Sequence, residues 1–301
     1  MFRKSPTNSN SLLQLNTAVF LFGFTGLFGK WLPVHPFVIV FGRVTFASLT
    51  LVLLLTLRGQ SLKIRSKRDL GGLVLIGGLL ALHWLSFFAS VQVSNVAICL
   101  IALSTTPVIV VLLEPLWFKH EPLAGSNVLV AIIVTLGVII ATPTWHIANA
   151  VTQGVLWGLL ASLTSALITL QSRRQVDHYE PLLVSFYQLT TVAVLLLPVM
   201  LFMRPLVTPH DVGLLALLGI IFTGVAQMLF MQSLLGVPAR LASLVTAGME
   251  VVYGVLLAAV LLHEIPSVRT LVGGGIIIVA TIYAMRQHHI ETLDVASGPP
   301  L

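Results

Sequence analysis

The side chains of this sequence that can do chemistry in an apolar environment are few, and they lie inside long uncharged stretches. If these stretches are helices that rise 1.5 Å per residue, Glu250 lies about 15 Å from the start of one, near its middle. By the same measure Arg43 lies about 10 Å into a second stretch, and His83, next to Trp84, about 20 Å into a third. An ionisable group in hydrocarbon costs at least ~2.5–3.5 kcal/mol, so each of these residues needs a partner or a function.

Each of these ionisable residues has a functional and a structural interpretation. Glu250 follows small residues and is the predicted substrate or proton site, because a carboxylate removed from water can take up a proton near neutral pH. It can instead bond a neighbouring helix and fix packing. Arg43 can bind a carboxylate with two parallel hydrogen bonds, or extend to the membrane surface or a helix end. His83 can relay protons or form a hydrogen bond between helices.

Uncharged residues complete the predicted substrate site. Gln188 is the counterpart of Arg43 in the second half of the chain and follows Tyr187. The aromatic candidates can line a cavity, although such residues are also ordinary packing material. The predicted substrate-binding residues are Glu250, Arg43, His83, Trp84, Tyr187, Gln188 and Tyr253. We predict no catalytic residue, no metal ligand and no cofactor.

Motifs of enzymes and of primary pumps are missing. Gly29-Lys30 is followed by Trp31 and lacks the second glycine of a phosphate-binding loop, so the chain is not expected to hydrolyse nucleotides itself. Neither His120-Glu121 nor His263-Glu264 continues to the second histidine of a zinc protease. No GxSxG element is present. We therefore expect a protein that is not an enzyme.

The elements that must position these side chains are long and apolar. Charged residues make up 9% of the 301 residues and hydrophobic ones 57%, and the mean hydropathy is +1.01. A soluble domain carries about 25% charged residues. Runs of roughly 18–23 residues suit helices that cross ~30 Å of hydrocarbon, where each backbone group must bond within its own helix. We predict an all-α integral membrane protein with ten transmembrane helices at 12–32, 36–57, 70–90, 95–117, 124–142, 152–172, 182–203, 211–234, 240–262 and 268–285.

The basic residues predict the orientation in the membrane. If the N-terminus is cytoplasmic, the outer loops carry only Lys30, Arg204 and Arg269, and nearly all other basic residues lie inside. Both termini are then cytoplasmic and the protein is a multi-pass protein of the cell inner (plasma) membrane. The net charge of +6 is explained by topology, so no nucleic-acid partner is expected. The first apolar run has full spanning length and no cleavage site, which is typical of a span and not of a signal peptide.

The two halves of the chain resemble one another. Phe118–Pro122 recurs as Leu261–Pro266, with the His-Glu pair 143 residues further on, and Pro36–Phe41 recurs as Pro181–Phe186. Each half contains five predicted spans, an odd number, so the second half begins on the opposite side of the membrane. Two inverted repeats are the recurring construction of secondary transporters. The predicted parts are a cytoplasmic segment 1–11, repeats 12–142 and 152–286, and a cytoplasmic, disordered tail 287–301.

On these features the chain resembles the drug/metabolite transporter superfamily, in its ten-span EamA-type branch. The resemblance rests on the doubled layout, on a fourth span centred on Pro107 and followed by Glu121, and on a ninth span followed by Glu264. It implies helices arranged around a central cavity and export of amino acids or other metabolites. The second-half equivalent of Pro107 is Glu250, so a charge breaks the repeat at this position.

We therefore expect a secondary transporter that exports amino acids or similar small polar metabolites, with proton exchange as one form of coupling. The expected partners are a small-molecule substrate and the lipid bilayer. One alternative is a carrier of another solute, such as a nucleobase, a sugar, or a lipophilic cation or drug. Another is a membrane protein that does not transport. Substrate, coupling ion, direction and oligomeric state stay open.

Overall fold

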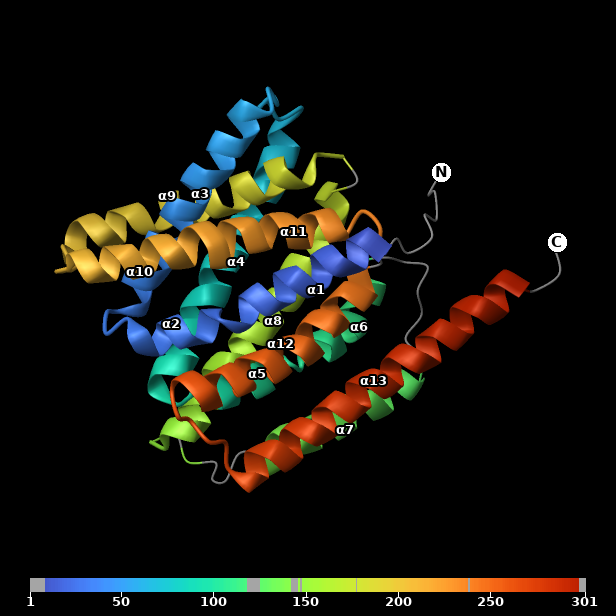
Figure 1. Cartoon of the computed structure of the whole chain (residues 1–301). Coiled ribbons are helices and arrows are strands. Elements are labelled where there is room, and N and C mark those ends of the chain that lie inside the picture. The colour runs from blue at the N-terminus through green and yellow to red at the C-terminus, as the bar shows by residue number, and fades with distance from the viewer. Residues whose placement is uncertain are drawn as a thin grey trace.

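The structure, a computed structural model, describes residues 9–117, 125–141, 146, 148–176, 178–237 and 239–297. Helices and no strands are found over these residues, so the all-helical prediction is confirmed for them (Figure 1). The helices are α1 (Ser9–Gly23), α2 (Thr25–Trp31), α3 (Pro36–Leu57), α4 (Lys67–Val93), α5 (Val96–Leu103), α6 (Thr106–Trp117), α7 (Gly125–Ala141), α8 (Ala150–Val176), α9 (Pro181–Met203), α10 (Pro209–Gly219), the π-helix η1 (Ile220–Val225), α11 (Ala226–Ser233), α12 (Ala239–Leu261) and α13 (Val268–Ser297).

Six helical stretches in the described part of the chain are long and apolar enough to cross a membrane. They are 10–31, 36–57, 67–93, 150–172, 181–203 and 209–233, and each matches a predicted span to within a few residues. The other four predicted spans fall on α5 with α6, on α7, on α12 and on α13; three of these hold shorter apolar stretches, at 96–110, 248–261 and 268–280. A multi-helix membrane protein is supported, and the total of ten spans stays a prediction.

The helix starts are determined by local sequence. Proline occupies the first turn of α3, α9 and α10, where its missing N–H removes no helical hydrogen bond. Thr208 and Asp211 form a capping box at α10, in which each side chain accepts from the other residue's backbone N–H. Asn95 caps α5 by accepting from the Ile98 N–H, which turns the chain sharply between α4 and α5.

The helices recur at the spacing that the duplicated sequence predicts. Val96 and Ala239, the first residues of α5 and α12, are 143 positions apart, and so are Gly125 and Val268, which begin α7 and α13. The packing recurs as well: α1 packs along α12 as α8 packs along α5, while α3 packs on α9 and α7 lies beside α13 (Figure 1). The first copy of the His-Glu motif, at 118–122, lies outside the described residues.

The C-terminal prediction needs a correction. Disorder was expected from residue 287 because the composition becomes polar, but α13 continues as a helix to Ser297. Polar residues such as Gln, Glu and Arg sustain a helix well once an apolar helix precedes them, because the costly nucleation has already taken place.

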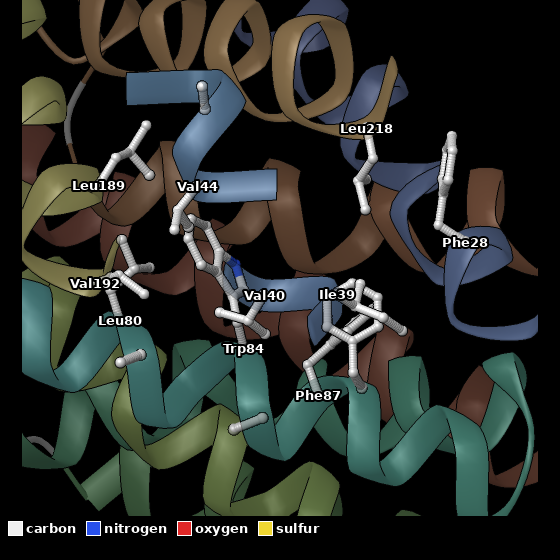
Figure 2. Close-up of a cluster of buried hydrophobic side chains, with 14 of the residues drawn as sticks. Phe28, Ile39, Val40, Val44, Leu80, Trp84, Phe87, Leu189, Val192 and Leu218 are labelled. Atoms are coloured by element: carbon white, nitrogen blue, oxygen red, sulfur yellow. The ribbon is translucent and has the colours of Figure 1, made fainter. Parts of the chain in front are cut away.

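The largest buried cluster fills the space between α3, α4 and α9. Figure 2 shows Trp84 rising from α4 toward Val40 and Val44 of α3. Other members from these and neighbouring helices are Phe28, Ile39, Leu80, Phe87, Leu189, Val192 and Leu218. This cluster fixes the distance between α3 and α4, and therefore the surroundings of Arg43, the residue before Val44.

Gly77 lets α4 approach α9 closely. A Cβ at this position would meet the Thr191 side chain and lie 3.0 Å from the Gln188 carbonyl oxygen, which belongs to backbone and cannot yield cheaply. The next residue, Gly78, faces open space, and a Cβ there would meet nothing within 4 Å. The two adjacent glycines therefore differ in what they do for packing.

We expect Gly77→Ala to lower the free energy of unfolding by about 1–3 kcal/mol, because overpacking forces α4 away from α9. Gly78→Ala is the matched control, and it should be neutral or stabilise the protein by up to ~1 kcal/mol, since alanine favours the helix. Thermal unfolding of the detergent-purified variants measures both. Equal effects of the two substitutions would show that Gly77 is not a packing point.

Candidate binding site around Arg43

Arg43 lies deep in the structure on α3, with 1% of its surface exposed. Its guanidinium carbon is 4.2 Å from the centroid of the Trp84 ring and 5.5 Å from that of Phe88, both on α4. The faces of aromatic rings attract cations, most strongly when both groups are desolvated. The side chain therefore does not extend to the surface, which was one of its two sequence-based interpretations.

A threonine of the second half of the chain holds this guanidinium in place. The Nε of Arg43 donates to Oγ1 of Thr223 at 3.0 Å, and Oγ1 donates in turn to the Leu218 carbonyl at 2.8 Å. Thr223 lies in the π-helix η1, a wider turn often found at functional sites. Gly219, just before η1, allows the close approach, since a Cβ there would lie 2.6 Å from the Arg43 carbonyl oxygen.

The guanidinium keeps a free hydrogen-bond donor. Nη1 of Arg43 is buried and forms no hydrogen bond with any described residue. A buried donor without a partner costs about 1–3 kcal/mol, so such groups mark places where a ligand or a water belongs. Arg43 thus combines a fixed orientation with unused capacity for an anion.

Glu250 lies within electrostatic reach of Arg43. It is partly exposed on α12, and the Coulomb interaction between the two side chains acts on both. No direct ion pair joins Arg43 and Glu250 in the described structure. The ion pair found among the described residues is Lys30–Glu264. A basic side chain of the first half and an acidic side chain of the second half therefore lie within Coulomb range of one another without direct contact.

His83 ties α4 to α8. Its Nδ1 lies 2.8 Å from the Ala161 carbonyl oxygen, and because a carbonyl only accepts, Nδ1 carries the proton in this contact. The ring also interacts electrostatically with Arg43. The geometry gives His83 an interhelical hydrogen bond next to the site, and its role in proton transfer stays a prediction.

The remaining candidates make contacts of their own. The Tyr187 hydroxyl donates to the Leu62 carbonyl at 2.7 Å, which fastens α9 to the loop after α3. Tyr253 is half-buried and meets the Phe20 ring edge-on, at 5.4 Å between centroids. The contacts of both tyrosines that are described here run to residues other than Arg43.

Gln188 occupies the second-half counterpart of the Arg43 position. It is fully buried, its Nε2 donates to Oγ of Ser172 at 3.2 Å, and its Oε1 accepts from Nε2 of Gln227 at 3.4 Å. Gln227 is 143 residues after Trp84. The contacting pair Arg43–Trp84 therefore recurs as the contacting pair Gln188–Gln227, with amides in place of the cation and the ring.

Sequence analysis missed Thr223. A single threonine in an apolar run carries no charge, and nothing in the sequence predicts a π-helix at that position. Phe88 was visible only as a neighbour of His83. The repeat offset was the one pattern able to find the partner of Gln188, because it carries Trp84 onto Gln227.

The fold and this site together define a helical membrane protein built from two copies of one helix arrangement, with a buried arginine where the two copies touch. The sequence model of the EamA-like transporter family matches residues 10–142 and 152–286. The chain therefore belongs to the EamA-like transporter family, within the drug/metabolite transporter superfamily. The resemblance seen in the sequence is confirmed.

Relatives agree with this assignment. The chain is 24% identical over 246 residues to the uncharacterized transporter YxxF of Bacillus subtilis (strain 168), which covers 80% of this chain and 78% of the relative. A solved structure described only as "Crystal structure of protein" superposes with a TM-score of 0.69 over 92% of this chain and 96% of the other, at 18% identity. At that identity the superposition supports the fold alone.

We expect Thr223→Val to lower the free energy of unfolding by about 1–3 kcal/mol, because it keeps the shape but leaves the Nε donor of Arg43 without an acceptor. Thr223→Ser should restore most of the stability. Thr164→Val is the matched control: Thr164 is equally buried in a helix, but its hydroxyl bonds only the Leu160 and Ala161 carbonyls of its own helix. Thermal unfolding in detergent measures the stability of all three variants. Similar losses for Thr223→Val and Thr164→Val would contradict a specific role of Thr223 in holding Arg43.

Proposed function

We propose that this protein carries amino acids or similar small zwitterionic metabolites across the plasma membrane, and that Arg43 and Glu250 bind them. The observation that supports the proposal is the buried guanidinium of Arg43, which has an unpaired Nη1 and lies within Coulomb range of Glu250. A substrate carboxylate would take the free donor of Arg43, and the ammonium group would lie toward Glu250.

A zwitterion suits this pair of opposite charges better than a simple ion. An anion alone would leave Glu250 uncompensated and meet its repulsion, and a cation alone would meet the repulsion of Arg43. In an α-amino acid the two charged groups are attached to one carbon, so both protein charges are matched by one small solute. From sequence depth alone, Arg43 and Glu250 differ by about 5 Å along the membrane normal, within the reach of such a molecule.

A lipophilic cation or drug is the less favoured alternative. Such a solute would bind through aromatic faces, but the faces of Trp84 and Phe88 are already turned toward the protein's own Arg43. Neutral sugars and nucleobases need hydrogen-bonding groups and would leave the charges of Arg43 and Glu250 without a match. The charged pair therefore points to a charged substrate of net charge near zero.

Export in exchange for protons fits the same two residues. Glu250 can hold either a proton or the substrate ammonium group, and not both, because protonation removes the negative charge that attracts the ammonium. A proton taken up on one side would then displace the substrate, and release of the proton on the other side would allow the next substrate to bind. The direction of transport rests on the family resemblance.

Counterflow into liposomes tests the substrate. With a panel of labelled amino acids, the purified protein should show saturable uptake that Glu250→Gln and Arg43→Lys each reduce roughly ten- to a hundredfold. Glu250→Gln removes the charge that attracts the ammonium group, and Arg43→Lys replaces the planar guanidinium that Thr223 orients by a flexible ammonium group, so each weakens a charge-assisted contact of about 1.5–3 kcal/mol. Glu180→Gln, at an exposed position between α8 and α9, is the matched control and should leave uptake unchanged.

Other outcomes change the proposal in defined ways. Saturable amino-acid uptake that both substitutions leave intact would return Arg43 and Glu250 to packing roles. Silence of the wild type across the amino-acid panel, with saturable uptake of nucleobases or sugars, would replace the substrate class.

The pH dependence of binding tests the proton. Affinity of the wild type for its substrate should fall as pH falls, because protonated Glu250 no longer attracts the ammonium group, and substrate binding should release protons into a weakly buffered solution. Glu250→Gln should bind more weakly, without pH dependence and without proton release. Calorimetric titration in buffers of different ionisation heat measures both quantities. A variant that keeps the wild-type pH profile would assign the proton to another group.

A further inference from the structure

Glu264, part of the repeated His-Glu motif, joins three separate segments of the chain. Its Oε1 lies 3.7 Å from Nζ of Lys30, the cation near the end of α2. Its Oε2 accepts from the backbone N–H of Val96, the first residue of α5, at 3.2 Å. Lys30 Nζ donates in turn to the Ser94 carbonyl oxygen at 2.8 Å, at the end of α4.

The two charges match the helix ends that they contact. The N-terminus of a helix carries a partial positive charge and attracts a carboxylate, while the C-terminal carbonyls attract a cation. Glu264 meets the start of α5, and Lys30 meets the end of α4. The turn between α4 and α5 is thus bound by Lys30 on one side and by Glu264 on the other, and the ion pair joins these two side chains to each other. We call Lys30, Glu264 and the backbone of 94–96 the latch.

The latch connects the two repeats. Lys30, Ser94 and Val96 belong to the first matched repeat, 10–142, and Glu264 belongs to the second, 152–286. Both charged side chains remain partly exposed, at 25% and 26%, so water can reach them and compete for the contacts. A connection of this kind can form and break without the cost of exposing a buried charge.

Beside the latch, glycines of α2 leave room for the side chains of the facing helices. A Cβ on Gly26 would lie 2.9 Å from the Val96 side chain, and one on Gly29 would lie 2.8 Å from the Val91 side chain, so α2 packs closely against α4 and α5. Between the repeats, a Cβ on Gly23 would lie 2.8 Å from Cβ of Tyr253 on α12. This end of the molecule is closed by contact between the repeats, and the latch lies over that contact.

We propose that the latch holds the outer end of the transporter closed and must break each time the Arg43 site opens outward. The inference rests on the proposed function and on the orientation that the basic residues predict. The closed state of a carrier must be only moderately stable, because a closure that is too stable would stop the transport cycle. Partly exposed charges that bind two helix ends provide a closure of this kind.

The sole cysteine supplies a reporter for opening. Cys99 is fully buried on α5, one turn beyond Val96, and it interacts electrostatically with Glu250 near the site. Its thiol donates to the Phe87 carbonyl, with 3.6 Å between sulfur and oxygen. When the α4–α5 turn leaves Glu264 and Lys30, the outer end of α5 is released, and a water-soluble thiol reagent gains access to Cys99.

The test is labelling of Cys99 by a membrane-impermeant maleimide, applied from the outer face or from the inner face of oriented vesicles. Lys30→Met and Glu264→Gln should accelerate labelling from outside about tenfold and slow labelling from inside, because a carrier that opens outward closes inward. Lys30→Arg keeps the charge and should resemble the wild type. Arg269→Met removes an exposed charge at the same end and is the matched control. Cys99→Ser gives the background.

Two results would overturn the latch. Outer labelling that neither substitution accelerates would mean that the contacts do not hold this end closed. Acceleration from both faces would mean that they stabilise the fold as a whole. If Lys30→Met or Glu264→Gln does not fold, the labelling of the other variant still tests the latch. The assay requires no solute, so a latch that shifts labelling while counterflow stays silent would refute the proposed substrates alone, and counterflow with unchanged labelling would refute the latch alone.

Discussion

A full positive charge buried in an apolar protein is the constraint that organises this structure. Arg43 exposes 1% of its surface, and an unpaired charge at such a place would cost far more free energy than a folded domain can spare. The protein compensates with the faces of Trp84 and Phe88 and with the hydroxyl of Thr223. Each of these comes from a different turn or helix, so the position of one side chain fixes the mutual placement of α3, α4 and η1.

The π-helix follows from the same constraint. An α-helix has no room for an extra residue per turn, whereas η1 accommodates one and turns the Thr223 hydroxyl toward Arg43 while Gly219 rests against the Arg43 backbone. A π-turn is less stable than an α-turn, so it persists where a tertiary contact compensates. The contact links α3 of one repeat to η1 of the other, so any change in the charge balance at Arg43 acts on the junction of the repeats.

Much of this could be predicted from the sequence, for physical reasons that differ between residues. Depth along an apolar run singled out Glu250 and Arg43, because charge in hydrocarbon is costly enough to be conspicuous in a single sequence. The repeat offset paired Gln188 with Arg43, and the starts of α5 and α12 are separated by the same 143 residues as the two His-Glu pairs. Thr223 was not predictable from the sequence. A hydroxyl can bond within its own helix at little cost in free energy, so a threonine in an apolar run is not conspicuous in the way that a charged residue is. Helical continuation of α13 past residue 287 was missed because polarity was taken for disorder.

The departures from repeat symmetry are as informative as the symmetry itself. Where the first repeat places Arg43 on Trp84, the second places Gln188 against Gln227, and where the first has Pro107, the second has Glu250. If the two halves were identical, a charged solute would meet equal fields from either side, and every charged position would occur twice. Here the cation occurs once and the anion once, in opposite repeats. The departures from symmetry therefore place one positive and one negative side chain in different repeats, which creates a local dipole that exact symmetry would have cancelled.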